Sequence, residues 1–197
     1  MPKEGHAEIA VLIDRSGSMD GLEDVVCKGF NTFLWQQVCA NGTANLTLAL
    51  FDDNYDLIHD SKPINEVPAL DTETYYVEGS TSLYDALGRT IKRLEARIKA
   101  QAESERPEVI IVAVTTDGYE NTSVEWDAKM VRDLIESKKD EGWQFLYISA
   151  IEEDHQAEKL GYDPTEISYY EKDEDGTFDS YLQMSTKTLD YRGGSHE

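Results

Sequence analysis

Lysine and arginine are scarce in this chain. Its 197 residues hold 18 of them against 40 aspartates and glutamates, which gives a formal net charge of −22. Phosphate binding needs clustered cations, so we expect no nucleic-acid partner, and an anionic membrane surface would repel the chain. The same charge attracts a divalent cation or a basic partner, and it also has the simpler consequence of keeping the protein soluble.

Cysteines and long apolar runs are also scarce. The only two cysteines, Cys27 and Cys39, fall in one predicted helix, too far apart along it for a disulfide. We expect both to be reduced and buried, which suits a cytoplasmic protein. No apolar run approaches the length of a membrane span, and residues 1–6 lack the pattern of a signal peptide. We therefore expect a cytoplasmic location.

The apolar residues that remain, 40% of the chain, are enough for one packed domain, expected at residues 5–190 with a frayed tail at 191–197. Short β-rich runs alternate with amphipathic helical patterns, one of which turns Met130 inward. This alternation predicts an α/β fold: a Rossmann-like doubly wound, mostly parallel sheet with one antiparallel edge strand and helices on both faces. Strands are expected at 9–13, 44–51, 55–60, 109–114, 143–150 and 167–170, and helices at 21–39, 80–102, 126–139, 152–160 and 177–189.

The first buried strand, residues 9–13, ends in a polar turn. Asp14, Ser16 and Ser18 stand at alternate positions there. Ligands of open α/β sheets bind at the carboxyl ends of the strands, and carboxylate with hydroxyl oxygens is a donor set that suits Mg²⁺ or Mn²⁺. The alternative for these five residues is a polar turn that caps the next helix.

Two later loops carry matching residues. Thr81 follows Gly79 in a glycine- and serine-rich loop, where its alternative role is that of an ordinary helix cap. The most apolar strand, residues 109–114, is expected at the sheet centre beside the first, and it is followed by Asp117 and Gly118. If the two strands are neighbours, their loops meet at one edge of the sheet.

These three elements, in this order, resemble the metal-ion-dependent adhesion site of the von Willebrand factor type A family. The resemblance covers roughly residues 8–161, and residues 76–86 and 106–110 are similar to the stand-alone members found in bacteria and phages. It implies that Asp14, Ser16, Ser18, Thr81 and Asp117 bind one divalent metal ion, Mg²⁺ or Mn²⁺ before Ca²⁺. It also implies a non-enzymatic adhesion or scaffolding module, in which an acidic residue of a partner protein completes the metal shell.

Other functions remain open at this stage. A hydrolase or phosphotransfer enzyme could use the same Asp, Ser and Thr residues, although no convincing base or nucleophile is present and His155 is the only histidine expected near the rim. Glu120 and Asn121 lie close to the third loop without an assigned role. Asp173 and Asp175 faintly resemble a calcium loop but lack its twelve-residue spacing.

Overall fold

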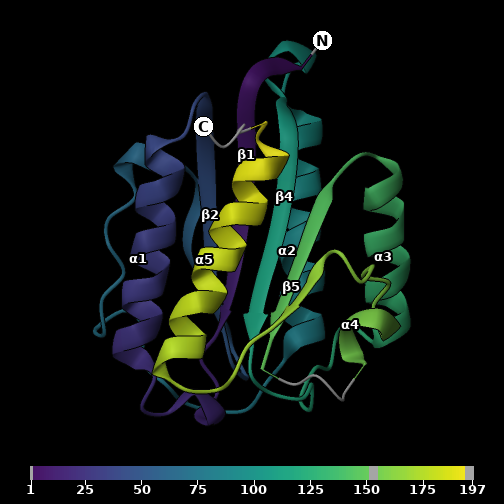
Figure 1. Cartoon of the computed structure of the whole chain (residues 1–197). Helices are drawn as coiled ribbons and strands as arrows, with labels where there is room; N and C mark the ends of the chain where they lie inside the picture. Colours follow the sequence, from purple (N-terminus) through teal and green to yellow (C-terminus); the bar gives the residue numbers. More distant parts are fainter. Residues whose placement is uncertain (1, 151–154, 194–197) are drawn as a thin grey trace.

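The computed structural model describes residues 2–150 and 155–193. Its centre is a six-stranded sheet in the order β3-β2-β1-β4-β5-β6 (Figure 1). Every neighbouring pair is parallel except β2 and β3, which are antiparallel, so the predicted fold class with its single antiparallel edge strand is confirmed. The strands are β1 (Lys3–Asp14), β2 (Thr43–Phe51), β3 (Tyr55–Pro63), β4 (Pro107–Thr116), β5 (Gln144–Ser149) and β6 (Ile167–Tyr169).

Strands β1 and β4 form the middle of the sheet, as the sequence predicts. Ile9 pairs with Ile111 and Ile13 pairs with Thr115, in parallel register. Both strands are longer than predicted, because residues beyond each end of their apolar runs also pair with neighbouring strands. The parallel register brings Asp14 and the end of β4 to the same edge of the sheet.

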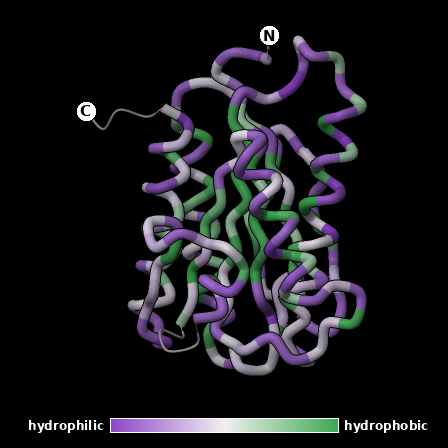
Figure 2. The backbone as a smooth tube through the Cα atoms, turned by 90° about the vertical axis from the view of Figure 1, so that its right-hand side faces the viewer, coloured by the Kyte–Doolittle hydropathy of each residue, from purple (hydrophilic) through white to green (hydrophobic). Residues whose placement is uncertain are grey.

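Helices cover both faces of the sheet. The helices are α1 (Glu23–Cys39), α2 (Leu83–Ala100), α3 (Ala128–Asp140), α4 (Gln156–Lys159) and α5 (Glu174–Tyr191). Helices α1 and α5 pack on one face, and α2, α3 and α4 pack on the other. Successive residues of a strand point to opposite faces, so Ile9, Val11 and Ile13 enter the first core and Ala10 and Leu12 the second. Figure 2 shows the hydrophobic residues concentrated along the strands between the two helix layers.

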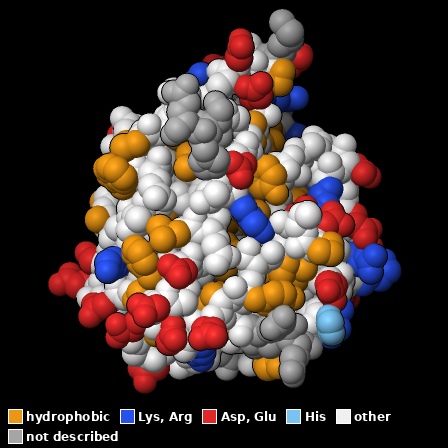
Figure 3. Space-filling model, in the orientation of Figure 1, with side chains coloured by type: hydrophobic (Ala, Val, Ile, Leu, Met, Phe, Trp, Pro, Cys, Tyr) orange, Lys and Arg blue, Asp and Glu red, His pale blue; other side chains and the backbone are white. Residues whose placement is uncertain are grey.

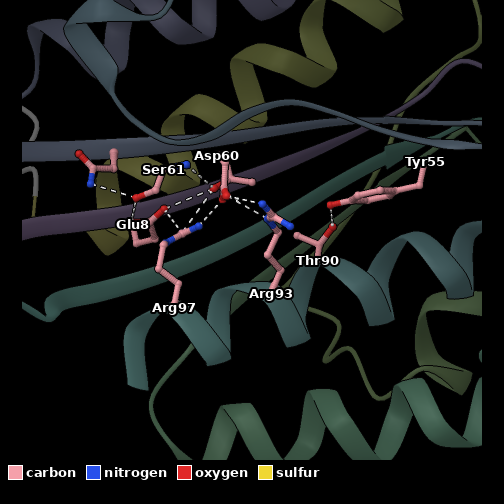
Figure 4. Close-up of polar contacts among 9 residues, drawn as sticks. Glu8, Tyr55, Asp60, Ser61, Thr90, Arg93 and Arg97 are labelled. Atoms are coloured by element: carbon pink, nitrogen blue, oxygen red, sulfur yellow. Dashed lines mark hydrogen bonds and ion pairs between the residues drawn. The ribbon is translucent and has the colours of Figure 1, made fainter. Parts of the chain in front are cut away.

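An ion-pair network braces the sheet at some distance from the carboxyl edge (Figure 4). Glu8 of β1 is 1% exposed, and its Oε1 accepts a hydrogen bond from Arg97 of α2 at 2.6 Å. Burial raises the pKa of Glu8, opposed by the nearby Arg97. Ser61 donates to Glu8 Oε2 at 2.9 Å, and Asp60 pairs with both Arg97 and Arg93. The network therefore ties β1, β3 and α2 together and satisfies a carboxylate on a central strand.

The segment 61–77, which connects β3 to the Thr81 loop, is closely attached to the rest of the fold. It begins with the end of β3 and a short 3-10 helix, Ile64–Glu66, and it buries Leu70 and Tyr75. The side-chain amide of Asn31 donates to Leu70 O at 2.9 Å and accepts its N–H at 2.7 Å. The connection is thus held against α1, and the Tyr75 hydroxyl donates to Asp14 O at the end of β1.

Two side chains, Met130 and Cys39, depart from the predicted burial. Met130 is 45% exposed, because α3 packs through Val131, Leu134 and Ile135 and so turns Met130 outward. Cys27 is buried but Cys39, at the end of α1, is exposed, and neither forms a disulfide. The prediction that both cysteines are buried is therefore wrong for Cys39.

The C-terminal helix is longer than predicted. α5 starts at Glu174 and extends to Tyr191, where the frayed tail was expected to begin, and Arg192 donates to Gln37 O at 2.8 Å. The rest of that predicted tail, residues 194–197, and the start of the predicted helix 152–160 lie outside the described residues. Within the described ranges, no helix combines the length and the apolar character needed to cross a membrane.

Candidate metal centre

The turn after β1 presents the first group of oxygens. Asp14 Oδ1 accepts the backbone N–H of Ser16 at 2.8 Å, a turn that an aspartate side chain commonly stabilises. The hydroxyl oxygens of Ser16 and Ser18 lie 3.0 Å apart. Asp14 and Ser16 are buried and Ser18 is exposed. The cluster is therefore rooted in the fold and reaches solvent at Ser18.

The end of β4 joins this turn through two crossed hydrogen bonds. The Ser18 hydroxyl donates to Asp117 Oδ1 at 2.6 Å, and the Thr116 hydroxyl donates to Asp14 Oδ2 at 2.6 Å. Both bonds are possible because β1 and β4 are parallel neighbours that end at the same edge. The two carboxylates that the sequence predicts as ligands thus belong to one polar cluster.

The loop that carries Thr81 is held in place by hydrogen bonds of its backbone. Gly17 N–H donates to Gly79 O at 3.0 Å, which joins this loop to the turn after β1. The side-chain oxygen of Asn121 accepts the N–H of Thr81 at 3.0 Å, and Asn121 N–H donates to Thr81 O at 3.1 Å. Asn121, which the sequence leaves without a role, therefore positions Thr81 rather than the metal.

Gly118 marks the point where the three loops converge. A methyl group placed on its Cα would lie 2.9 Å from Thr81 Oγ1, 3.4 Å from Ser18 Oγ and 3.8 Å from Asp14 Oδ2. Oxygens of the turn after β1 and of the Thr81 loop therefore approach Gly118 of the loop after β4, and a side chain at this position would intrude among them. The structure brings all five predicted ligand residues into this cluster, and their role as ligands stays a prediction.

A buried arginine holds the loops around the cluster. Arg15 Nε donates to Asp52 Oδ2 at 2.7 Å, and both residues are almost fully buried. Arg15 Nη2 pairs with Asp56 at 2.7 Å, while Arg15 O accepts the N–H of Glu78 at 3.0 Å. Asp52 O accepts Ser82 N–H at 3.0 Å. The Arg15–Asp52 pair therefore connects the turn after β1 to both sides of the Thr81 loop.

The N-terminus of α2 is capped by the loop that follows β4. Glu120 Oε2 accepts the N–H of Tyr84 at 3.0 Å, and Ser123 Oγ accepts the N–H of Asp85 at 3.1 Å. In return, the Asp85 carboxylate accepts three backbone N–H groups of the β4–α3 loop, those of Val124, Glu125 and Trp126. Glu120 is therefore committed to the helix end, and the partly positive N-terminus of α2 is offset by carboxylates.

The electrostatics of the cluster favour a cation. Burial raises the pKa of Asp14 to about 6, because desolvation outweighs the hydrogen bonds from Ser16 and Thr116. The neighbouring Asp117 raises that pKa further. Asp117 Oδ2 is buried, and the ammonium of Lys172 lies 2.5 Å from it. A positive charge at this point stabilises both carboxylates.

The donor set fits a hard divalent cation. Two carboxylates and three hydroxyls supply oxygen ligands, which Mg²⁺ and Mn²⁺ prefer. In the described part of the chain, no three His, Cys, Asp or Glu side chains gather as metal ligands. Two of the histidines lie elsewhere: His6 of β1 contacts Thr43 of β2, and His155 is an exposed residue that contacts Glu158. The single histidine expected near the rim therefore has a local surface contact instead.

Sequence reasoning missed the residues that support the cluster. Thr116 was overlooked because it looks like the last residue of a strand, although a hydroxyl directly before Asp117 could have been noticed. Arg15 could have been noticed as a basic residue within a turn of acidic and hydroxyl side chains. Lys172 Nζ lies 2.5 Å from Asp117 Oδ2. The two residues are far apart in sequence, so no local pattern predicts their contact.

Neither a protein-family model nor a curated protein matches the sequence. Solved structures do match the fold. The vWF domain of the type V pilus tip protein Mfa5 from Porphyromonas gingivalis superposes with a TM-score of 0.70 at 9% identity, covering 97% of this chain and 98% of that one. The manganese-loaded TRAP protein of Plasmodium vivax gives 0.60 at 17% identity, covering 88% and 72%.

A third similar structure is the proximal thread matrix protein 1 of the mussel byssus, with zinc in its MIDAS motif. Its TM-score is 0.63 at 16% identity, and the match covers 93% of this chain and 46% of that one. This chain also spans only 43% of a von Willebrand factor type A protein from Catenulispora acidiphila, with a TM-score of 0.62. Strand order, helix layers and these superpositions agree, and the chain has the von Willebrand factor type A fold.

Proposed function

We propose that this protein is a divalent-metal-dependent protein-binding module. The observation that carries the proposal is the convergence of oxygens of the Asp14 turn and of the Thr81 loop on Gly118, next to the buried Asp117 carboxylate. Such a cluster is costly unless a cation satisfies it, because buried carboxylates near one another repel each other.

Five residues would hold the metal: Asp14, Ser16, Ser18, Thr81 and Asp117. Five oxygens would leave one position of an octahedral Mg²⁺ or Mn²⁺ ion open, so the bound ion would supply an electrophilic position for an oxygen of a partner. The exposed side chain of Ser18 marks the side on which solvent, and thus a partner, can approach. We propose that an acidic residue of the partner takes this position.

The charge of the protein shapes the kind of recognition to be expected. At a net charge of −22, the domain repels an acidic partner at long range, but this repulsion is screened over about 8 Å at physiological salt. Figure 3 shows acidic side chains gathered at the lower left of one face, where the first turns of α1 and α5 lie. Affinity would therefore depend on direct coordination rather than on electrostatic steering.

The similar structures support this reading by what they contain. The TRAP protein is loaded with manganese, and the byssus matrix protein has zinc in its MIDAS motif. A further similar structure is a domain of a pilus tip protein. We extend three further expectations from the sequence as part of the proposal: no catalytic activity, a cytoplasmic location, and a bacterial or phage origin. A metal-dependent hydrolase or phosphotransferase is the alternative that the experiment below also tests.

The test is metal binding measured by isothermal titration calorimetry, with Mg²⁺ and with Mn²⁺. Thr81→Val and Ser16→Ala each remove one hydroxyl, and Ser80→Ala removes a neighbouring hydroxyl as the matched control. We expect one ion per chain for the wild type and the control, and binding weakened at least tenfold in the two site variants. Absence of binding in the wild type, or equal binding in all four proteins, would refute the proposal.

Partner binding is tested by capture from a lysate of the source cells, with Mg²⁺ or with chelator, followed by mass spectrometry. A partner retained only with Mg²⁺ and lost in Ser16→Ala supports the module. Capture that survives chelation contradicts metal-dependent recognition. Phosphatase or nuclease turnover that requires Mn²⁺ and disappears in Asp14→Ala would favour the enzyme instead.

A further inference from the structure

Lys172 brings a positive charge of the chain itself to the proposed metal site. It lies between β6 and α5, far in sequence from the three loops, and its Nζ is 2.5 Å from Asp117 Oδ2. That oxygen is buried. The ammonium therefore provides the charge that offsets this carboxylate oxygen.

The backbone on both sides of Lys172 is anchored. Tyr170 is buried, and its N–H donates to Ser149 O at 3.1 Å, which fixes the chain after β6. Asp173 is the N-cap of α5, and its Oδ1 accepts the N–H of Gly176 at 2.7 Å. The lysine is thus presented to the site by a fixed segment, and its reach to Asp117 does not depend on a loose loop.

The side chain itself can leave. The Lys172 side chain is 41% exposed, whereas that of Asp117 is fully buried. Four methylene groups on a fixed backbone allow the ammonium to swing into solvent without any movement of β6 or α5.

An ammonium and a metal ion compete for the same oxygen. A Mg²⁺ ligand oxygen lies about 2.0–2.1 Å from the ion, so an ammonium that stays in contact with that oxygen would sit within a few ångström of a divalent charge. Repulsion at this distance is strong in a partly buried site. We infer that Lys172 is an intramolecular competitor that sets the metal affinity of this site: it pairs with Asp117 when metal is absent and is displaced when metal binds.

This inference rests on the proposed function and adds an affinity-setting residue to it. The lysine has opposite effects in the two states. Without metal it stabilises the protein, because Asp117 would otherwise be a buried charge without a cation. With metal it opposes binding, because its contact with Asp117 must first be broken.

The test compares Lys172→Met with Lys99→Met. Lys99 is an exposed lysine that pairs with Glu95 near the end of α2, so its replacement makes the same change in net charge away from the site. By calorimetry with Mn²⁺ and with Mg²⁺, Lys172→Met is expected to bind about tenfold more tightly than the wild type. Lys99→Met is expected to stay within about twofold of it.

Thermal unfolding gives a second, independent readout. In chelator, Lys172→Met is expected to unfold at a lower temperature than the wild type, and saturating Mg²⁺ is expected to raise its unfolding temperature by more. A third readout is the labelling of Lys172 by an amine-reactive reagent, followed by mass spectrometry. Labelling should increase when Mg²⁺ is added, while labelling of Lys99 in the same sample should not change.

Each outcome decides between the two proposals. Wild-type metal binding that is lost in Ser16→Ala but unchanged in Lys172→Met leaves the metal site standing and overturns the role of Lys172. Tight metal binding by Lys172→Met where the wild type binds only weakly supports the competitor most strongly. If neither protein binds metal, the proposed function fails and this inference fails with it. Labelling of Lys172 that is unaffected by bound metal also overturns it.

Discussion

Gly118→Ala tests the proposed site without removing any ligand. The added methyl group would lie 2.9 Å from Thr81 Oγ1 and 3.4 Å from Ser18 Oγ. Ordinary contacts between carbon and oxygen are a few tenths of an ångström longer than the first of these distances, so Thr81 or the Gly118 backbone must shift. Mg²⁺ needs near-ideal octahedral geometry at about 2.0–2.1 Å, and a shift of that size in one ligand is not tolerated.

We therefore expect Gly118→Ala to weaken Mg²⁺ binding at least tenfold, which is about 1.4 kcal/mol of binding free energy. The free energy of unfolding in chelator should fall by only about 1–2 kcal/mol, because the methyl group is small and the site partly open. Calorimetric titration measures the first quantity and urea unfolding the second. The two together separate damage to the site from damage to the fold.

Gly142→Ala is the matched control. Gly142 has a φ of +90° and no neighbour within 4 Å of an added methyl group, and it follows α3 away from the Asp14 and Thr81 loops. An alanine there strains the backbone by roughly 1–2 kcal/mol but does not approach the metal site. If Gly118→Ala binds Mg²⁺ as tightly as the wild type, or if both variants lose affinity equally, the converging-loop geometry does not control metal binding.

Three further predictions concern stability. Asp52→Asn leaves the buried Arg15 without its main charged partner and should lower the free energy of unfolding, measured in urea, by about 3 kcal/mol. A decrease below about 1 kcal/mol would mean that Asp56 replaces Asp52 as the partner of Arg15. Hydrogen bonds from Lys138 and two further lysines lower the pKa of Glu95 from 4.5 to about 2, so its contribution is present above pH 4.5 and is lost as the pH falls toward 2. The stability difference between wild type and Glu95→Gln should therefore shrink over that range, and a constant difference from pH 7 to pH 3 would contradict this assignment. Tyr75→Phe removes the buried hydroxyl that donates to Asp14 O at 2.8 Å and should lower the free energy of unfolding by about 1 kcal/mol. An unchanged midpoint of urea unfolding would show that this hydrogen bond contributes nothing to stability.

Most of the fold could be predicted from local patterns. Apolar runs such as residues 109–114 identify buried strands because such strands need apolar side chains on both faces, and helical spacing identified the helices that cover the sheet. Element ends were less accurate. β1 starts at Lys3 because polar residues also pair in the sheet, and α5 continues to Tyr191 because its apolar face packs on α1.

The candidate site, too, could be predicted only in part from the sequence. Asp14 and Asp117 could be placed together because parallel neighbouring strands bring their following loops to one edge, and Thr81 was added to them by the family resemblance. The residues that hold them there could not. Asn121 supports Thr81 through the backbone, and Lys172 reaches Asp117 from a segment 55 residues later along the chain, a contact that depends on the tertiary path after β6. Such partners carry no periodicity and follow no fixed spacing.

The most direct test of the account is a crystal structure of the protein grown with Mn²⁺, with data collected at the manganese absorption edge. The account predicts one anomalous peak between Asp14, Thr81 and Asp117, with the Lys172 ammonium moved away from Asp117. No peak at that position under saturating Mn²⁺, or a peak only at another place on the surface, would contradict the central claim that these three loops form a metal site.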